Sequence, residues 1–566
     1  MPGRKGRRRK EEVGEGSEAA GGETERPRPA WARWLDERLR PQLKGLAETR
    51  MPLVWGLALA TGVLAAYGIL LFRYGIGAVQ WLWLSEMAEN IVATRARLSH
   101  PFIVFAAPVI GGLVVGLLLV HLAPRRRAEG VADVIEAVHL RRGRIGWQEG
   151  LSSAVITVLS LGFGASAGRE GPAVHIGATL ASLLGRPFAM PVASRRMLLA
   201  AGAAAAVSAS FNAPVAGVIF AHEVILGHYA LSAFVPTVLA AVVATMITRV
   251  HLGDYPAFVI PTYEIASYLE LPAFVLLGLV AGLVAVAFLL LTGALDGLAR
   301  RLPMPLWLRP VAGGAIIGIM AIRVPEILGV GYEATNLALN GRYDLWSLLV
   351  LLGAKMLATA VTLASRFGGG VFSPSLFLGA MVGGAFGLVV GGLYPDGASH
   401  HGAYALVGMS ATAGAVLGAP LSTALIVFEL TRDYHITIAL LVATSIASLV
   451  MQVLVRRSFF HWQLAQRGLE LDEGPHKRIM KTLTVGDFMI PREKGESTIV
   501  PEPFDERPRL HRDDTLEKAL RAFGRGTYTR LAVVDRSGRL VGWADHARAM
   551  EVFNEKLIEA SVEEHR

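Results

Sequence analysis

The sequence contains no cysteine and little charge. The absence of cysteine from its 566 residues excludes disulfide scaffolds, thiolate metal sites, iron–sulfur clusters and cysteine nucleophiles. Charged residues make up 18% of the chain, below the roughly 25% of soluble proteins, whereas hydrophobic residues make up 53%. The mean hydropathy is +0.45. These values exclude a set of ordinary soluble domains and predict a polytopic membrane protein.

The first 50 residues form a polar tail with a basic cluster between Arg4 and Lys10, followed by a run rich in glutamate and glycine. The tail lacks the apolar core of a signal peptide, so we expect residues 1–50 to be a disordered cytoplasmic arm. The net charge of +9, together with basic flanks beside apolar segments, indicates anionic lipid headgroups as partners. A nucleic-acid or nuclear-targeting role is the disfavoured alternative, and we expect no nucleic-acid partner.

Between Met51 and about Val455 the chain is a succession of apolar segments. Four are about 20 residues long, enough to cross a bilayer core of ~30 Å: 52–72, 103–123, 271–291 and 345–365. Others are shorter and broken by glycine, proline or charge, near 151–165, 174–187, 197–209 and 213–227. Short segments must be buried against protein or line a water-filled cavity. This mixture predicts a transporter or channel.

Basic residues set the expected orientation of the membrane region. Loop 124–146 carries six arginines, against three in loop 73–100. Because cytoplasmic loops are rich in arginine and lysine, loop 124–146 and the basic tail are expected to face the cytoplasm. We therefore expect a multi-pass protein of the cell membrane (plasma or bacterial inner membrane), with both termini cytoplasmic.

Two sequence patterns recur at nearly one offset. Residues 172–178 (PAVHIGA) match 374–380 (PSLFLGA), 202 positions later. Residues 213–223 match 419–429, 206 positions later, and each copy has a proline and a glutamate nine apart. Internal repeats in a transporter predict two facing halves with a substrate site between them, here at about 51–250 and 270–456. Duplicated packing modules without a site are the alternative.

The composition becomes that of a soluble protein after Arg457, and residues 480–555 are expected to form a small domain. The pattern predicts an opening strand near Val485 and a helix over 515–523. Two strands, 530–534 and about 540–543, flank a turn at 535–538, and a helix starts at Ala544.

Two glycine-rich loops carry the candidate chemistry. Residues 162–175 (GFGASAGREGPAVH) and 368–374 (GGGVFSP) each contain a proline suited to the first turn of a helix. A helix N-terminus offers unpaired amides and about +0.5 charge, so it can hold an anion without a full positive charge. Two such ends directed at one point predict weak, multi-site binding of a small anion that must leave again.

Glu170 lies inside the first of these loops. A carboxylate within a membrane segment is costly, which makes it a functional candidate. Beside an anion site, it takes the place of the anion when charged and leaves it when protonated, which predicts a gate and proton carrier. The alternative is an Arg169–Glu170 pair that only fixes the loop.

The segments Gly168-Arg-Glu-Gly-Pro172 and Gly370-Val-Phe-Ser-Pro374 resemble the signature loops of the CLC family of voltage-gated chloride channels and chloride/proton antiporters. The resemblance covers about residues 50–470, and the region 480–555 is similar to a CBS domain. It implies an all-α polytopic membrane fold over 51–470, with an inverted repeat of many tilted and partial helices, plus a small α/β cytoplasmic domain. It also implies a homodimer with one anion pathway per subunit.

The resemblance further implies the residues of the anion site and its ligands. Glu170 is then the gating glutamate, and the transported species are chloride, other small monovalent anions and protons. The amides of Glu170, Gly171, Val371 and Phe372 coordinate the anion. The full anion-binding set is Gly168, Arg169, Glu170, Gly171, Pro172, Gly370, Val371, Phe372 and Pro374.

Three positions depart from the family pattern. The usual G-S-G-x-P loop is matched best by residues 128–132, which place Glu129 before Gly130; its charge would repel an anion unless it is protonated or points to the cytoplasm. The central tyrosine corresponds to Phe460, which lacks the hydroxyl donor, so Gly130 and Phe460 are the inner-gate candidates. Val224 occupies the proton-relay position and carries no proton, which puts stoichiometric coupling in doubt; water, Glu129 or His222 are the possible substitutes.

Other residues favour plainer interpretations. His222 and His228 are six apart rather than the four that a helical zinc site needs, so no metal or cofactor is expected. His175 is interpreted as a core histidine or as a group that tunes Glu170. A single CBS-like domain binds an adenine nucleotide, with Asp535 as the ribose contact, or only braces the dimer.

These observations favour transport of chloride and similar small anions through a glutamate-gated pathway, by a channel or a weakly proton-coupled transporter. A fully coupled chloride/proton antiporter is the first alternative. A membrane-embedded nucleotide sensor or an enzyme is the second, and no catalytic constellation within the spans supports an enzyme.

Overall fold

The computed structural model describes residues 50–565, except 255–257, 259–262, 264–269, 396, 470–478, 481, 494–496, 503, 505 and 527. The polar tail predicted for residues 1–50 lies almost wholly outside the described residues. Within them, seven helical segments are long and apolar enough to cross a membrane. They are α3 (Met51–Leu84), α5 (Pro101–His121), α11 (Leu231–Leu252), α12 (Leu271–Arg301), α15 (Leu345–Ala364), α16 (Phe372–Leu393) and α19 (Tyr434–Leu454), which continues towards α20 (Phe459–Ala465).

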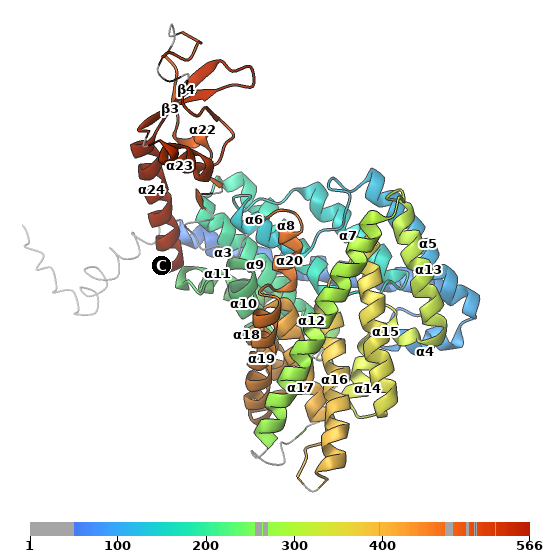
Figure 1. Cartoon of the computed structure of the whole chain (residues 1–566). Helices are drawn as coiled ribbons and strands as arrows, with labels where there is room; N and C mark the ends of the chain where they lie inside the picture. Colours follow the sequence, from blue (N-terminus) through green and yellow to red (C-terminus); the bar gives the residue numbers. More distant parts are fainter. Residues whose placement is uncertain are drawn as a thin grey trace, which may run out of the picture. The chain divides into compact units, whose positions relative to one another are not determined.

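Shorter helices lie between these spans (Figure 1). Glycine, proline and charge interrupt their apolar runs. Helix Val192–Phe211 has 20 residues but carries two arginines near its start; the others have 17 residues or fewer, too few for the full bilayer, and pack against protein instead. They are α4 (Val92–Leu98), α6 (Val131–His139), α7 (Trp147–Gly162), α8 (Glu170–Gly185), α9 (Val192–Phe211), α10 (Pro214–Phe220), α13 (Leu308–Arg323), α14 (Tyr332–Leu339), α17 (His401–Leu417) and α18 (Pro420–Thr431). A π-helical segment, Ala221–Leu226, follows α10, and 3₁₀ turns occur at Glu89–Ile91, Arg186–Phe188 and Pro325–Ile327.

Helices α16 and α17 lie side by side through a stripe of small residues (Figure 1). A Cβ added to Gly379 would lie 2.3 Å from the carbonyl oxygen of Gly408. A Cβ added to Gly383 would lie 2.2 Å from the carbonyl oxygen of Tyr404. Only glycine permits such an approach, as is common between membrane helices. Gly391, the last residue of the stripe, has no neighbour of this kind within 4 Å.

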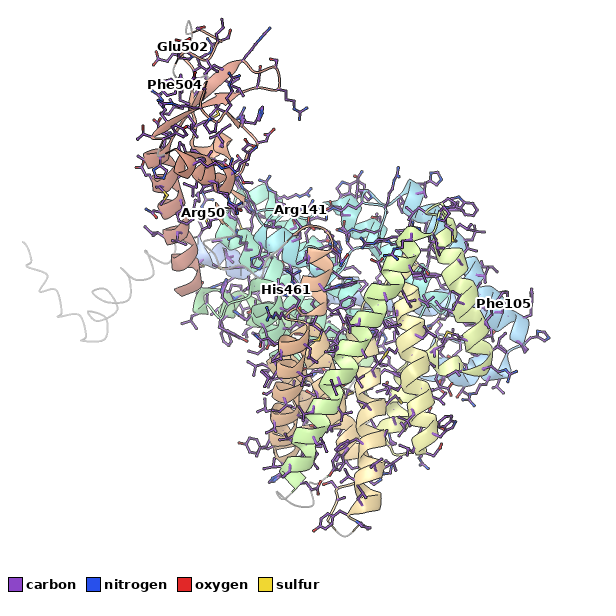
Figure 2. The ribbon with its side chains drawn as sticks, in the orientation of Figure 1. Arg50, Phe105, Arg141, His461, Glu502 and Phe504 are labelled. Carbon is purple, nitrogen blue, oxygen red and sulfur yellow. The ribbon has the colours of Figure 1, made fainter. Side chains whose placement is uncertain are left out.

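Large apolar side chains project outward from the long helices. Leu71 of α3 is 75% exposed and Leu393 of α16 is 81% exposed. Figure 2 draws the side chains of these helices, with Phe105 of α5 among those labelled. Contiguous apolar surface of this extent is unusual in water and normal where lipid is the solvent.

The C-terminal domain contains a four-stranded sheet of order β1-β4-β3-β2. Strand β4 (Leu540–Asp545) pairs antiparallel with β1 (Ile490–Pro491) and β3 (Arg530–Val534), whereas β2 (Leu510–His511) is parallel to β3. The helices are α22 (Val485–Phe488), α23 (Leu516–Arg525) and α24 (His546–His565). The apolar face of α23 joins the buried side of β3 in the core. The predicted small α/β domain is confirmed.

One element of this domain differs from the prediction. The strand expected near Val485 is the short helix α22, and the first strand begins at Ile490. The side chain of Asp487 accepts hydrogen bonds from the amide and the hydroxyl of Thr484, both at 2.9 Å. This capping arrangement starts a helical turn in a segment whose apolar residues alone favoured a strand.

Candidate functional site

The two glycine-rich loops meet in space. The amide of Gly168 donates to the carbonyl of Gly370 at 2.7 Å, and the amide of Gly370 donates to the carbonyl of Gly168 at 2.8 Å. These two glycines are 202 positions apart, which is the offset of the first repeated pattern. Reciprocal antiparallel pairing of equivalent residues relates the two loops by a local two-fold axis. The N-termini of α8 and α16 begin two residues after this bridge.

The backbones of both loops approach each other closely at the starts of α8 and α16. A Cβ added to Gly370 would lie 3.3 Å from the nitrogen and from the Cα of Gly171, so the two backbones nearly touch. Among the described residues, no acceptor is found for the amides of Glu170, Gly171, Val371 and Phe372. Each helix end therefore offers unpaired amides and the positive end of its dipole. Two such ends side by side form an arrangement able to hold a small anion.

The carboxylate of Glu170 lies at this junction and is fully buried. Its Oε1 accepts a hydrogen bond of 2.7 Å from the hydroxyl of Tyr332. The Nε of Arg169 lies 3.8 Å from the same oxygen, a looser contact than the alternative of a loop-fixing pair requires. Oε2 is buried without a hydrogen-bond partner in the described part of the chain. A buried oxygen left in this state is costly, which is typical of a functional position.

The loop that carries Tyr332 is held by a buried lysine. Lys355, on α15, donates to the carbonyls of Ile327 at 3.0 Å and Gly329 at 2.8 Å. Gly331, just before Tyr332, has a φ of +90°, which favours glycine. Neither Tyr332 nor Lys355 was identified as a site residue from the sequence. A lysine inside an apolar span was a signal that could have identified Lys355.

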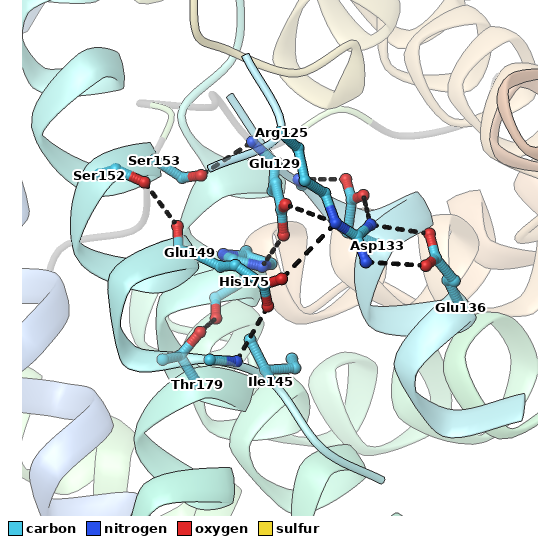
Figure 3. A network of polar contacts seen from close by, with 12 residues as sticks. Arg125, Glu129, Asp133, Glu136, Ile145, Glu149, Ser152, Ser153, His175 and Thr179 are labelled. Carbon is cyan, nitrogen blue, oxygen red and sulfur yellow. Dashed lines mark hydrogen bonds and ion pairs between the residues drawn. The ribbon is translucent and has the colours of Figure 1, made fainter. Parts of the chain in front are cut away.

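Glu129 is buried beside Arg125 and His175 (Figure 3). Its Oε1 lies 3.4 Å from the Nε of Arg125, and its Oε2 lies 3.1 Å from the Nε2 of His175. Its charge would repel an anion, and we did not assign this side chain as an anion ligand. It is only 3% exposed and lies next to a guanidinium group. His175 is likewise buried, in contact with an acid rather than as a plain core residue.

Further ion pairs surround Glu129 and balance most of the local charge (Figure 3). Asp133 receives hydrogen bonds from Arg127 at 2.5 Å and from Arg467 at 2.9 Å. Arg125 also pairs with Glu136 at 3.0 Å, and Arg141 pairs with Glu149 at 2.9 Å. Ion pairs therefore hold the loop at residues 128–132, which differs from the family pattern, in place.

The amides of this loop are already paired. The amide of Glu129 donates to the Ser153 hydroxyl at 2.9 Å, and the amide of Gly130 donates to Asp133 at 3.0 Å. Gly130 still approaches the anion loops, because a Cβ added there would lie 3.9 Å from the carbonyl carbon of Gly171. Phe460, the other inner-gate candidate, is 5% exposed on α20, which packs against α6. The Gly130 amide is therefore occupied, whereas the amide of Phe460, in the first turn of α20, has no acceptor among the described residues, and its side chain has no hydroxyl.

The repeated glutamates cap one another's helices. Glu223 accepts hydrogen bonds from the amides of Leu421 at 3.0 Å and Ser422 at 2.9 Å, at the start of α18. Glu429 accepts from the amides of Val215 at 3.1 Å and Ala216 at 2.7 Å, at the start of α10. The interpretation that these carboxylates bond backbone groups is confirmed. The exchange is again reciprocal between the halves.

The residues next to Glu223, His222 and Val224, are not arranged as a proton relay. Val224 is buried in the π-helical segment Ala221–Leu226. The Nδ1 of His222 lies 3.1 Å from the carbonyl oxygen of His228, so this ring is engaged locally. Across the described residues, no group of three or more histidines and carboxylates is placed to hold a metal ion.

Asp535, the candidate ribose contact, is occupied by its own turn. Its Oδ1 accepts hydrogen bonds from the Ser537 amide at 2.9 Å and hydroxyl at 2.7 Å, and from the Arg539 amide at 2.9 Å. The Ser537 side chain and the Arg539 amide are the main reasons why the pKa of Asp535 is lowered. This geometry favours a role in closing the turn between β3 and β4 over contact with a nucleotide.

The polytopic helical fold and the paired amide loops define the class as a membrane transporter or channel for small anions. The chain belongs to the family described as voltage gated chloride channel, whose model matches residues 111–452. A ClcB-like chloride channel protein of Ralstonia nicotianae is 35% identical over 386 residues, 68% of this chain and 90% of the relative. Chloride channel protein CLC-e of Arabidopsis thaliana is 34% identical over 422 residues, 69% of this chain and 58% of the relative.

Solved structures share the fold. A slow cyanobacterial Cl⁻/H⁺ antiporter matches with a TM-score of 0.66 and 24% identity, over 74% of this chain and 99% of the antiporter. A eukaryotic CLC transporter matches with a TM-score of 0.64 and 18% identity, over 88% of this chain and 98% of that structure. The expected CLC fold and the expected family are confirmed. The chain is a multi-pass membrane protein that transports chloride.

Proposed function

We propose that chloride crosses this protein between the N-termini of α8 and α16, with Glu170 as the gate. The observation that carries the proposal is the Gly168–Gly370 bridge, which places unpaired amides of both halves around one buried carboxylate. The charged carboxylate competes with chloride for the amides, and its protonation frees them. The anion is held by backbone dipoles without a full positive charge, so it binds weakly enough to leave again.

The mode we propose is a channel or a weakly proton-coupled transporter. Val224 cannot relay a proton, and Phe460 leaves the inner end of the pathway without a hydroxyl donor. We expect liposomes that contain the full chain to release chloride at a rate well above protein-free liposomes, measured with a chloride electrode. An absence of chloride release from well-folded protein would contradict the proposal.

Proton-coupled exchange is the second candidate, and the Glu129–His175 contact favours it. Both side chains are buried, and neither ring nitrogen of the histidine makes a hydrogen bond within the described residues. His175 lies on α8, five residues after Glu170, which is about 7.5 Å along a helix. Glu129, His175 and Glu170 are therefore titratable groups that could carry protons, which Val224 at the usual relay position cannot do.

This second candidate predicts the effect of Glu129→Gln on proton movement. A chloride gradient is expected to drive little proton uptake in the unaltered protein. Because glutamine cannot carry a proton, Glu129→Gln should lower this proton uptake about a hundredfold, the lower end of the effects of lost acid–base groups. Uptake is followed with a pH-sensitive dye inside liposomes. The matched control is His222→Gln at the other relay candidate, which should retain uptake; the reverse pattern would move the relay to His222.

We also propose the assembly and orientation that family membership suggests. These are a homodimer with one pathway per subunit, and a cell-membrane location with cytoplasmic termini. Loop 124–146, which is rich in arginine, supports this orientation. For the C-terminal domain, we propose a dimer brace in preference to a nucleotide sensor, since Asp535 is already occupied by its turn.

A further inference from the structure

A large cavity lined by arginines lies beside α20. It encloses about 430 Å³, within the range of roughly 300–1,000 Å³ for small-molecule pockets. The ends of several helices and the loop before α6 converge on it. Its charged lining residues are Arg125, Arg126, Arg127, Asp296, Arg300, Arg309, Arg366 and Arg467. The lining also includes Phe459, Trp462, Gln463 and Gln466 of the α20 region.

The positive charge of this cavity is only partly balanced. Asp296 is the one carboxylate among the lining residues, and it pairs with Arg300 at 2.5 Å and more loosely with Arg366 at 3.8 Å. Arg126 and Arg309 form no ion pair among the described residues, and the Nε of Arg309 is buried without a hydrogen-bond partner. Arg125, Arg127 and Arg467 pair with Asp133, which is not among the lining residues. Arg126 and Arg309 are thus the guanidinium groups of the lining that have no counter-charge among the described residues.

The pKa of Arg366 shows the effect of the neighbouring guanidinium groups. It follows α15 and is surrounded by protein, and burial lowers the pKa of its guanidinium group. Asp296 opposes this shift. Three neighbouring cations lower the pKa further: Arg300, Arg309 and Arg127. The clustered cations therefore repel one another, and a bound anion of more than one charge would relieve the repulsion.

The chemistry of the lining selects the kind of anion. Guanidinium groups present planar forks of N–H donors that match the oxygens of phosphate in pairs. The volume greatly exceeds that of one chloride ion, and Trp462 and two glutamines add an aromatic face and amide groups. Chloride is instead held by backbone amides at the α8–α16 junction.

We propose that this cavity binds a polyvalent phosphate group and that the bound group restricts chloride passage. The cavity adjoins the segment that leads to Gly130, and Phe459 in its wall precedes Phe460. An occupant therefore contacts the chain three residues before Gly130, at Arg127, and one residue before Phe460. The restriction of passage rests on the proposed function, whereas the binding does not. The phosphate belongs to a soluble ester or to a lipid headgroup, which share this chemistry.

Binding is tested on the purified full chain with inorganic pyrophosphate, by equilibrium dialysis at physiological ionic strength. A parallel arm uses vesicles that contain phosphatidylinositol phosphate. Arg309→Gln should weaken pyrophosphate binding about tenfold or more, as expected for one lost charge-assisted contact. Arg323→Gln is the matched control, since it removes an arginine at the other end of the same helix, outside the cavity. Arg366→Gln is a second cavity variant in case Arg309→Gln folds poorly.

The outcomes separate the parts of the proposal. Saturable pyrophosphate binding that only the cavity variants weaken supports a soluble ligand, and binding confined to the phosphoinositide vesicles supports a headgroup. No saturable binding in either arm, or equal weakening in Arg323→Gln, overturns the site. Pyrophosphate should also slow chloride efflux in the unaltered protein and not in Arg309→Gln. Binding without slowing overturns the restriction, and an absence of efflux in all samples is a failure of the proposed pathway instead.

Discussion

Glu170→Ala is expected to abolish the pH dependence of chloride efflux while chloride still flows, at an equal or higher rate. In the unaltered protein, the charged carboxylate competes with chloride for amides of α8 and α16, so efflux should rise as the pH falls. One titrating group allows a change of up to about tenfold per pH unit. Alanine leaves no titrating group at the junction, and its efflux should be flat across the same pH range.

Two further variants locate this effect at the carboxylate. Glu170→Gln keeps the volume and the uncharged state, so it should behave as Glu170→Ala does. Tyr332→Phe removes the hydroxyl that bonds Oε1 at 2.7 Å but leaves the carboxylate in place, so a pH response should persist. Efflux is measured from liposomes buffered at several pH values. A pH response that is unchanged in both Glu170 variants would assign the gate to another residue.

The sequence predicts the two helix N-termini of the proposed anion site better than it predicts the side chains that hold Glu170 in place. The glycine runs and the repeated prolines predict two helix N-termini at Glu170 and Phe372, because these signals are local in the chain. The contact between Tyr332 and Glu170 joins residues 162 positions apart. No local periodicity encodes such a contact, and it depends on how α14 packs against α16.

The Glu129 loop shows a different limit. Comparison with the family pattern identifies the carboxylate and its repulsion of an anion, but it does not identify the compensating charge. Arg125 stands four residues earlier, a spacing that was visible in the sequence. His175, on another helix, required the fold. The balancing charge comes from neighbouring side chains, which comparison with a family pattern does not consider.

The C-terminal domain illustrates a missed local signal. Thr484 and Asp487 have the spacing of a capping box, which predicts a helix start at Val485. The apolar residues of this segment were read by alternation alone, and the strand was therefore placed too early. Helix α23 and both longer strands were placed within a few residues, since their apolar residues are buried in the two hydrophobic clusters of this domain.

Gly168→Ala is expected to reduce chloride efflux strongly, because the junction has no room for a Cβ. A Cβ at this position would lie 2.9 Å from Oε2 of Glu170, and 3.0 Å from both the Pro374 Cδ and the Ser373 nitrogen. Backbone and proline atoms cannot move aside without shifting α16. Overpacking of this kind costs about 1–3 kcal/mol, which corresponds to a loss of the intact junction of roughly fivefold to 150-fold.

The matched control is Gly391→Ala, since Gly391 lies on α16 and has no neighbouring atom within 4 Å of an added Cβ. This variant gains helix propensity and should transport as the unaltered protein does. Both variants are compared by efflux per amount of protein that elutes as a single species from a sizing column. If Gly168→Ala folds and transports at the rate of Gly391→Ala, the Gly168–Gly370 bridge does not form part of the pathway, and the anion must pass where the two half-helices do not meet.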